Sequence, residues 1–215
     1  MFNRVLLLAR VALRLGILNI ARVVLYRFQI KSGYLQRLTP VGDVEQGQIY
    51  NADCLRPKTL PEHLHTDYLS QADIILSGRH NFFFNQIQKV GSPPKWRQWN
   101  ESCEGPHWTK VAINSKVGED AKRSWDLSRF HWMPCLAAAY AVSYEERYLN
   151  AINNWFSDWS AHNAYNSGVN WVCAQEVSIR LINILNTAFL LGVHKSAVSE
   201  VLLRVVVAHC QRICP

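Results

Sequence analysis

The chain has 215 residues, of which 49% are hydrophobic and 18% are charged, and this balance excludes an intrinsically disordered protein. Its formal net charge of +7 indicates a polyanionic partner, and nucleic acid, anionic lipid and acidic polysaccharide all carry the matching sign. No zinc-finger spacing, RNA-binding aromatic pair or basic zipper region is present, so we expect no nucleic-acid partner. The 24 aromatic residues (eight each of Trp, Tyr and Phe) suit either a core or a sugar-binding cleft.

Residues 1–30 are predicted to form a basic amphipathic helix, within an N-terminal arm of residues 1–38. Arg10, Arg14 and Arg22 recur at helical spacing among Leu, Val and Ile. These charges interrupt the roughly 18–20 apolar residues that a membrane span needs, and no small-residue cleavage site follows a clean apolar core. The helix therefore either docks on the protein's own body or lies on an anionic membrane surface. We expect a cytoplasmic or peripheral inner-membrane location, and a periplasmic one stays open.

Residues 39–120 are predicted to form an irregular entry segment. Proline and glycine interrupt residues 39–61 repeatedly, and a short helix is expected over residues 62–77. The three phenylalanines of residues 82–84, followed by Asn-Gln-Ile-Gln-Lys-Val, predict a short strand or hairpin that Gly91 and two prolines end. Residues 105–118 are again expected to be irregular.

From residue 121 the chain is predicted to consist of helices. One spans residues 124–142, with Pro134 as a kink or restart. A second begins at Ser143, which stands three residues before Glu146 in capping-box spacing, and runs to about residue 161. The third and fourth are expected over residues 171–191 and from 196 to about 213. Because the connections are short, neighbouring helices should be antiparallel. The predicted fold class is all-α, and residues 121–215 would begin an incomplete α/α toroid.

The six cysteines are irregularly spaced: Cys54, Cys103, Cys135, Cys173, Cys210 and Cys214. Cys210 and Cys214 are four residues apart, but no second close pair completes a metal site. Cys135 and Cys173 lie in apolar helical patterns, which is typical of buried free thiols. We therefore expect no metal, no cofactor and no disulfide framework.

Three stretches resemble the N-terminal region of heparinase II/III-type proteins: ADIILSGRHNFFFNQIQKVGSPPKW (residues 72–96), WDLSRFHWMPCLAAAYAVSYEERY (125–148) and GVNWVCAQEVSIRLINIL (168–185). Their order and spacing together are more specific than any one stretch. The resemblance implies an α/α toroid followed by a β-sandwich-like domain, and β-elimination on uronate-containing polysaccharide. It also implies that the catalytic Asn-His pair, the Tyr and the His of the β domain lie beyond Pro215, so this part alone is expected to be inactive.

The partners implied by the resemblance are an acidic polysaccharide, together with the missing C-terminal half of the toroid and its β domain. An unmatched apolar stripe of Leu202, Leu203 and Val206 in the last helix would fit a truncated or frameshifted lyase. Two alternatives stay open. One is a non-catalytic module that binds acidic carbohydrate, and the other is a membrane-surface assembly module led by residues 1–30.

No catalytic residue is assigned, and the candidate substrate-binding residues are Trp125, Arg129, Trp132, Asn170, Trp171 and Gln175. If residues 124–142 form one helix, Trp125, Arg129 and Trp132 share a face. Arg129 would then pair a uronate carboxylate and a Trp would stack on a sugar ring. Alternatively, the two Trp residues are core and Arg129 bridges helices.

The remaining candidates have equally plain structural interpretations. Asn170 either caps a helix or donates to sugar hydroxyls from a loop. Glu176 and Arg180, four residues apart in the favourable order, are predicted to form a structural ion pair. Gln175 would be a polar contact beside them, and His131 is assigned to structure or solvent.

Overall fold

The computed structural model describes residues 14, 16–43, 46–82, 86–96, 105–111, 115–193 and 198–215, with the side chains of residues 82 and 115–120 left aside. This part of the chain is mostly helical and has two short strands, which confirms the all-α class. The chain divides between Thr39 and Pro40 into two compact units. None of the helices in the described ranges combines the length and the apolar character needed to cross a membrane.

The first unit contains α2 (Ile17–Lys31) and α3 (Tyr34–Leu38). Gly33 separates the two helices at a φ of 73°, a left-handed conformation that glycine adopts without a Cβ penalty. The predicted N-terminal helix is confirmed over residues 17–31, and residues 1–13 and 15 lie outside the described ranges. Every residue of α2 is at least partly exposed.

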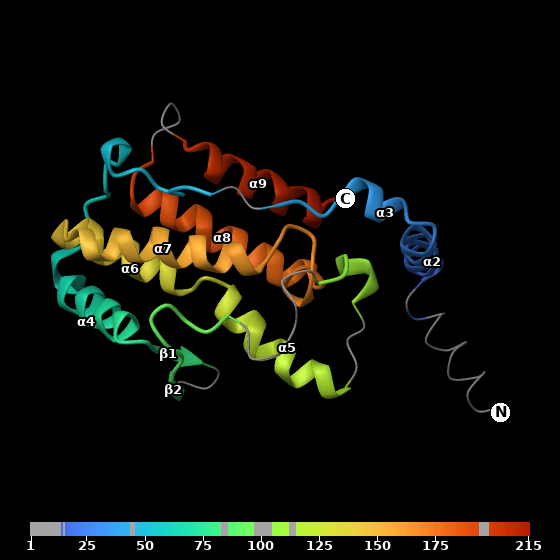
Figure 1. The fold of residues 1–215 in the computed structure, drawn as a ribbon, viewed down its shortest axis with the longest axis horizontal. Coiled ribbons are helices and arrows are strands. Elements are labelled where there is room, and N and C mark those ends of the chain that lie inside the picture. Colours follow the sequence, from blue (N-terminus) through green and yellow to red (C-terminus); the bar gives the residue numbers. More distant parts are fainter. Residues whose placement is uncertain are drawn as a thin grey trace. The chain divides into compact units, whose positions relative to one another are not determined.

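The second unit is built around antiparallel helices that follow one another along the chain (Figure 1). They are α6 (Trp132–Ser143), α7 (Glu146–His162), α8 (Ala174–Leu190) and α9 (Glu200–Ile213), and α4 (His65–Leu76) packs against α6. Eight of the 12 residues of α6 are buried, because α4, α7 and α8 all contact it. A helix that is apolar on every side takes this central place.

The entry segment and the first helical hairpin agree with the sequence pattern in part. α4 lies within the predicted range, after a 3₁₀ turn at Glu62–Leu64. The expected hairpin is confirmed as β1 (Arg79–Phe82) paired antiparallel with β2 (Gln86–Lys89), while residues 83–85 lie outside the described ranges. The predicted irregular stretch over residues 105–118 ends early, since α5 (Ser115–Ser128) already begins within it.

The prediction of one helix over residues 124–142 is wrong, because residues 129–131 separate α5 from α6. Phe130 adopts a φ of 62°, which costs a non-glycine residue about 1–3 kcal/mol. Its ring is fully buried and meets Trp159 edge-on, with 4.9 Å between ring centroids. This aromatic packing offsets the strain. Pro134 causes no break, because it lies in the first turn of α6, where a missing N–H costs no helical hydrogen bond.

The helix starts also differ from the sequence expectations. Ser143 does not form a capping box: its Oγ donates to the Ala139 carbonyl and accepts from the Glu145 amide, and α7 has no side-chain cap. Ser199 caps α9, with its Oγ 3.1 Å from the Leu202 amide, so α9 begins at Glu200. The third predicted helix is shortened to α8, after a 3₁₀ turn at Val169–Trp171.

Residues 46–60 have a fixed path across α7 and α8 although they contain little regular structure (Figure 1). The Asn153 side chain accepts from the Tyr50 amide at 3.0 Å and donates to its carbonyl at 2.9 Å. The Tyr50 hydroxyl donates to the Ile184 carbonyl at 2.7 Å. Further along, the amides of Arg56 and Lys58 donate to carbonyls at the end of α8.

Replacing Asn153 by Ala should lower the free energy of unfolding by about 2–4 kcal/mol, because two buried backbone groups of Tyr50 lose their partner. The matched control is Asn154→Ala on the same helix, since the Asn154 side chain is exposed. Urea denaturation followed by circular dichroism measures both variants. Equal losses in the two variants would contradict this account of the segment.

Candidate functional site

The short connection between α5 and α6 places Arg129 at the centre of a polar cluster. Its Nε donates to Glu176 Oε2 at 2.6 Å and its Nη2 to Glu176 Oε1 at 2.8 Å, while Nη1 lies 3.1 Å from Asp126 Oδ1. The Arg129 side chain is only 22% exposed. Its guanidinium fork is therefore engaged by carboxylates of the protein itself.

The cluster contains two carboxylates for one guanidinium, so its charge balance is negative. Burial raises the pKa of Asp126 above its ordinary value, while the nearby Arg129 guanidinium acts against that rise. Burial also lowers the pKa of His131. The Nδ1 of His131 lies 3.2 Å from the side-chain nitrogen Nδ2 of Asn183, which also donates to the Arg129 carbonyl at 2.8 Å. A neutral imidazole that accepts at Nδ1 fits this arrangement.

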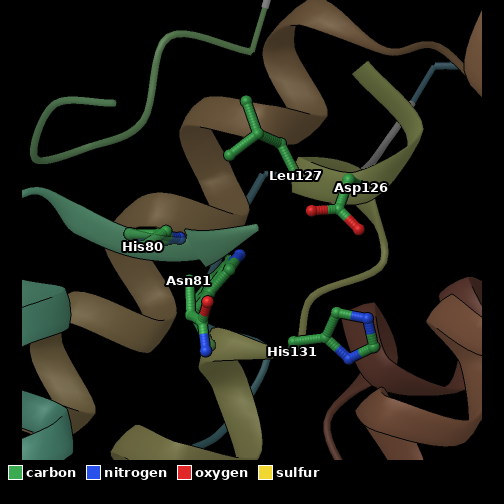
Figure 2. Close-up of a pocket in the computed structure, with 6 residues that line it drawn as sticks. His80, Asn81, Asp126, Leu127 and His131 are labelled. Atoms are coloured by element: carbon green, nitrogen blue, oxygen red, sulfur yellow. The ribbon is translucent and has the colours of Figure 1, made fainter. Parts of the chain in front are cut away.

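A small pocket opens beside this cluster, lined by His80 and Asn81 of β1, Asp126 and Leu127 of α5, and His131 and Trp132 (Figure 2). Its volume of about 20 Å³ is enough for one water molecule but far too small for a sugar ring. The His80 Nε2 is buried and has no hydrogen-bond partner among the described residues. Burial lowers the pKa of His80 to about 4, so its ring is neutral near pH 7. The pocket suits a single hydroxyl or water.

The predicted stacking residues are less accessible than the sequence suggested. Trp132 is 2% exposed and its ring centroid lies 5.3 Å from that of Trp155 in the core. Trp171 is fully buried against His209. Trp125 is half-buried, and its indole N–H donates to the Val169 carbonyl at 2.8 Å. Of the three indoles, only Trp125 has a partly open face.

The polar candidates also divide into a buried residue and an exposed one. Asn170 is 3% exposed, donates to Asn163 Oδ1 at 2.8 Å and accepts from the Ser124 hydroxyl at 3.3 Å. It does not cap α8, which begins at Ala174. Gln175, by contrast, is exposed in the first turn of α8. Trp125 and Gln175 are therefore the predicted site residues that a ligand can reach.

Glu176 pairs with Arg129 rather than with Arg180. Both residues of the predicted pair are buried, but the Glu176 carboxylate lies toward the connection between α5 and α6, and Arg180 reaches a deeper layer. The guanidinium of Arg180 donates to His209 Nε2 at 2.9 Å and to the carbonyls of Ser128 and Asn170. Burial lowers the pKa of Arg180 to about 9, which leaves it charged at pH 7.

Of the residues that line the pocket, the sequence pattern singled out Trp132 alone as a site residue. It gave no role to His80, Asn81 or Asp126, and His131 was assigned to structure or solvent. They meet only because β1 lies against the end of α5. Within the described ranges, no three His, Cys, Asp or Glu side chains gather as a metal site, and the five described cysteines are free thiols.

Stability should fall as the pH drops below about 6.5, because two buried histidines resist protonation. Burial lowers the pKa of His209 to about 3 and that of His80 to about 4. An unfolded chain binds these protons near the ordinary histidine pKa of about 6.5. Each histidine therefore removes about 1.4 kcal/mol per pH unit between 6.5 and its folded value. The raised pKa of Asp126 acts in the opposite direction.

The measurement is urea denaturation at a series of pH values from 7 downward, on the wild type and on His209→Gln. A glutamine oxygen can still accept from Arg180 but does not titrate. The free energy of unfolding of the variant should therefore fall less steeply with decreasing pH than that of the wild type. His63→Gln, at an exposed histidine, is the matched control. A slope that responds equally to both substitutions would show that His209 is not responsible.

Residues 62–212 match a family described as heparinase II/III N-terminus. The matched range covers well over half of the chain and runs from the 3₁₀ turn before α4 almost to the end of α9. It contains all three stretches quoted above, so the resemblance drawn from them is confirmed. No curated protein and no solved structure matches the chain.

Proposed function

This chain belongs to the heparinase II/III N-terminus family, and we propose that it forms the first helical hairpins of a lyase that cleaves uronate-containing acidic polysaccharide by β-elimination. The observation that carries this proposal is the family match over residues 62–212, which spans the helical framework from α4 to α9. Successive antiparallel hairpins of this kind are the units from which an α/α toroid is built.

Exposed apolar side chains on the last two helices support a continuation of the helical array. Ile182, Leu185 and Phe189 lie on one face of α8 and are 46–66% exposed, and Leu203 and Val207 are similarly open on α9. Leu202, which the sequence placed in an unmatched stripe, is buried instead. We propose that further hairpins of the same toroid cover the exposed residues.

The elimination chemistry needs a group that neutralises the uronate carboxylate, a base and an acid. Arg129 is the cation of the described site, and Glu176 and Asp126 already engage it. We therefore assign the chemistry to parts of the lyase outside this region. The region itself would frame the cleft, with Gln175 and Trp125 in reach of a sugar chain and the small pocket accepting one hydroxyl.

The proposal predicts that the chain binds an acidic polysaccharide without cleaving it. Affinity electrophoresis in gels containing alginate, heparan sulfate or hyaluronan should show retardation in at least one, and a gel containing neutral dextran should show none. The same mixtures should develop no ultraviolet absorbance from unsaturated uronate. Because basic residues of α2 could cause retardation by charge alone, the triple variant Arg22→Gln, Arg27→Gln, Lys31→Gln is run beside the wild type.

Retardation that survives in the triple variant supports a binding surface on the helical body. Gln175→Ala should then weaken it several-fold, and Gln211→Ala, at an exposed glutamine of α9, should not. Absence of retardation in every acidic gel would overturn the proposal. Appearance of unsaturated uronate would support the lyase but overturn the assignment of its chemistry to other parts.

A further inference from the structure

The net positive charge of this protein lies in its N-terminal segment. Residues 1–42 contain seven Lys and Arg and no Asp or Glu, which equals the whole formal net charge of +7. Residues 43–215 contain 16 Lys and Arg and 16 Asp and Glu, so this part is neutral. The attraction for polyanions that the total charge indicates is therefore a property of the arm, and the region that matches the family does not share it.

The helix of that segment also presents an uncovered apolar stripe. Ile17, Val24 and Phe28 follow one another at intervals of seven and four residues, which places them on one face of α2. They are 85%, 61% and 66% exposed. Such large side chains are rarely left open together on a short helix without a binding role.

Basic residues are arranged around this stripe in the way a membrane surface requires. At 100° per residue, Arg27 and Lys31 border one side of the stripe, and Arg22 lies toward the opposite side. Their long aliphatic stems can lie along an apolar layer while the charged ends stay in the headgroup region. Fifteen residues rise only about 22 Å, which is short of the ~30 Å hydrocarbon core.

We propose that α2 lies flat on the surface of an anionic lipid bilayer, with Ile17, Val24 and Phe28 at the boundary of the acyl chains and Arg22, Arg27 and Lys31 against the phosphate headgroups. An acidic polysaccharide offers the matching charge but no apolar phase, so it leaves the stripe unexplained. This anchoring does not rest on the proposed lyase function, because it concerns a helix outside the matched range.

The test is flotation of the full chain with vesicles of phosphatidylcholine, with or without phosphatidylglycerol. The wild type should float with the anionic vesicles and much less with the neutral ones. The triple variant Arg22→Gln, Arg27→Gln, Lys31→Gln should bind on the order of 100-fold more weakly, at about fivefold for each charge removed. Raising the salt concentration should weaken binding in the same direction.

Two variants of equal charge separate the apolar stripe from simple ion attraction. Val24→Asn with Phe28→Asn should reduce vesicle binding ~tenfold or more, because apolar area no longer enters the bilayer. Val23→Asn with Tyr26→Asn changes residues on the opposite face of α2 and should bind nearly as the wild type does. Circular dichroism and urea denaturation of each variant verify that the helical body is intact.

Four outcomes would overturn the proposal. Equal binding to both kinds of vesicle would exclude the charge contribution, and equal binding by both asparagine variants would show a charge-only contact, as with a polysaccharide. If Val24→Asn with Phe28→Asn lowers the stability of the body while vesicle binding is absent, the helix docks on the protein itself. Self-association of the wild type without vesicle binding, abolished in that variant, would identify a second copy as the partner.

Discussion

The helical body depends on one buried cation, the guanidinium of Arg180. It lies between the rings of Trp159 and Trp171, at 4.8 and 5.0 Å from their centroids. Three hydrogen bonds reach the end of α5, the 3₁₀ turn before α8, and His209 of α9. A buried charge is tolerated only when its donors are satisfied. This side chain therefore fixes the relative positions of segments that are far apart in the sequence, and its neutral histidine partner links the packing to pH.

A half-buried guanidinium, that of Arg129, changes what the candidate site can do. Arg129 looks like a carboxylate-binding residue when the sequence is considered alone, but Glu176 occupies its fork from α8. The site that results is a small pocket with a negative charge balance, and its His80 Nε2 has no partner within the described ranges, so the pocket suits a hydroxyl better than a uronate. The net positive charge lies instead in the first 42 residues. The proposed polysaccharide contact and the proposed membrane contact would thus belong to different parts of the chain.

Much of the helical framework could be predicted because apolar periodicity is a local property of the chain. α7, α8 and α9 lie within a few residues of their predicted ranges, and the short β-hairpin was predicted from its phenylalanine run and the glycine and prolines that follow. The break between α5 and α6 could not be predicted, since the left-handed Phe130 is held there by Trp159, 29 residues further on. The capping box at Ser143 failed because its hydroxyl bonds back to its own helix. A hydroxyl such as that of Ser143 can bond to several nearby backbone groups, and the tertiary packing decides which of these bonds forms.

The sequence by itself determined the all-α class, the family and the location of the net positive charge in the arm, because composition and ordered motifs do not depend on how helices pack. Only the tertiary structure decided which carboxylate meets which guanidinium. Glu176 is four residues from Arg180 but pairs with Arg129, 47 residues away, since the connection between α5 and α6 brings Arg129 to the start of α8. It also decided that Trp132 and Trp171 are core. Burial depends on every neighbouring segment at once, and no single stretch of sequence contains that information.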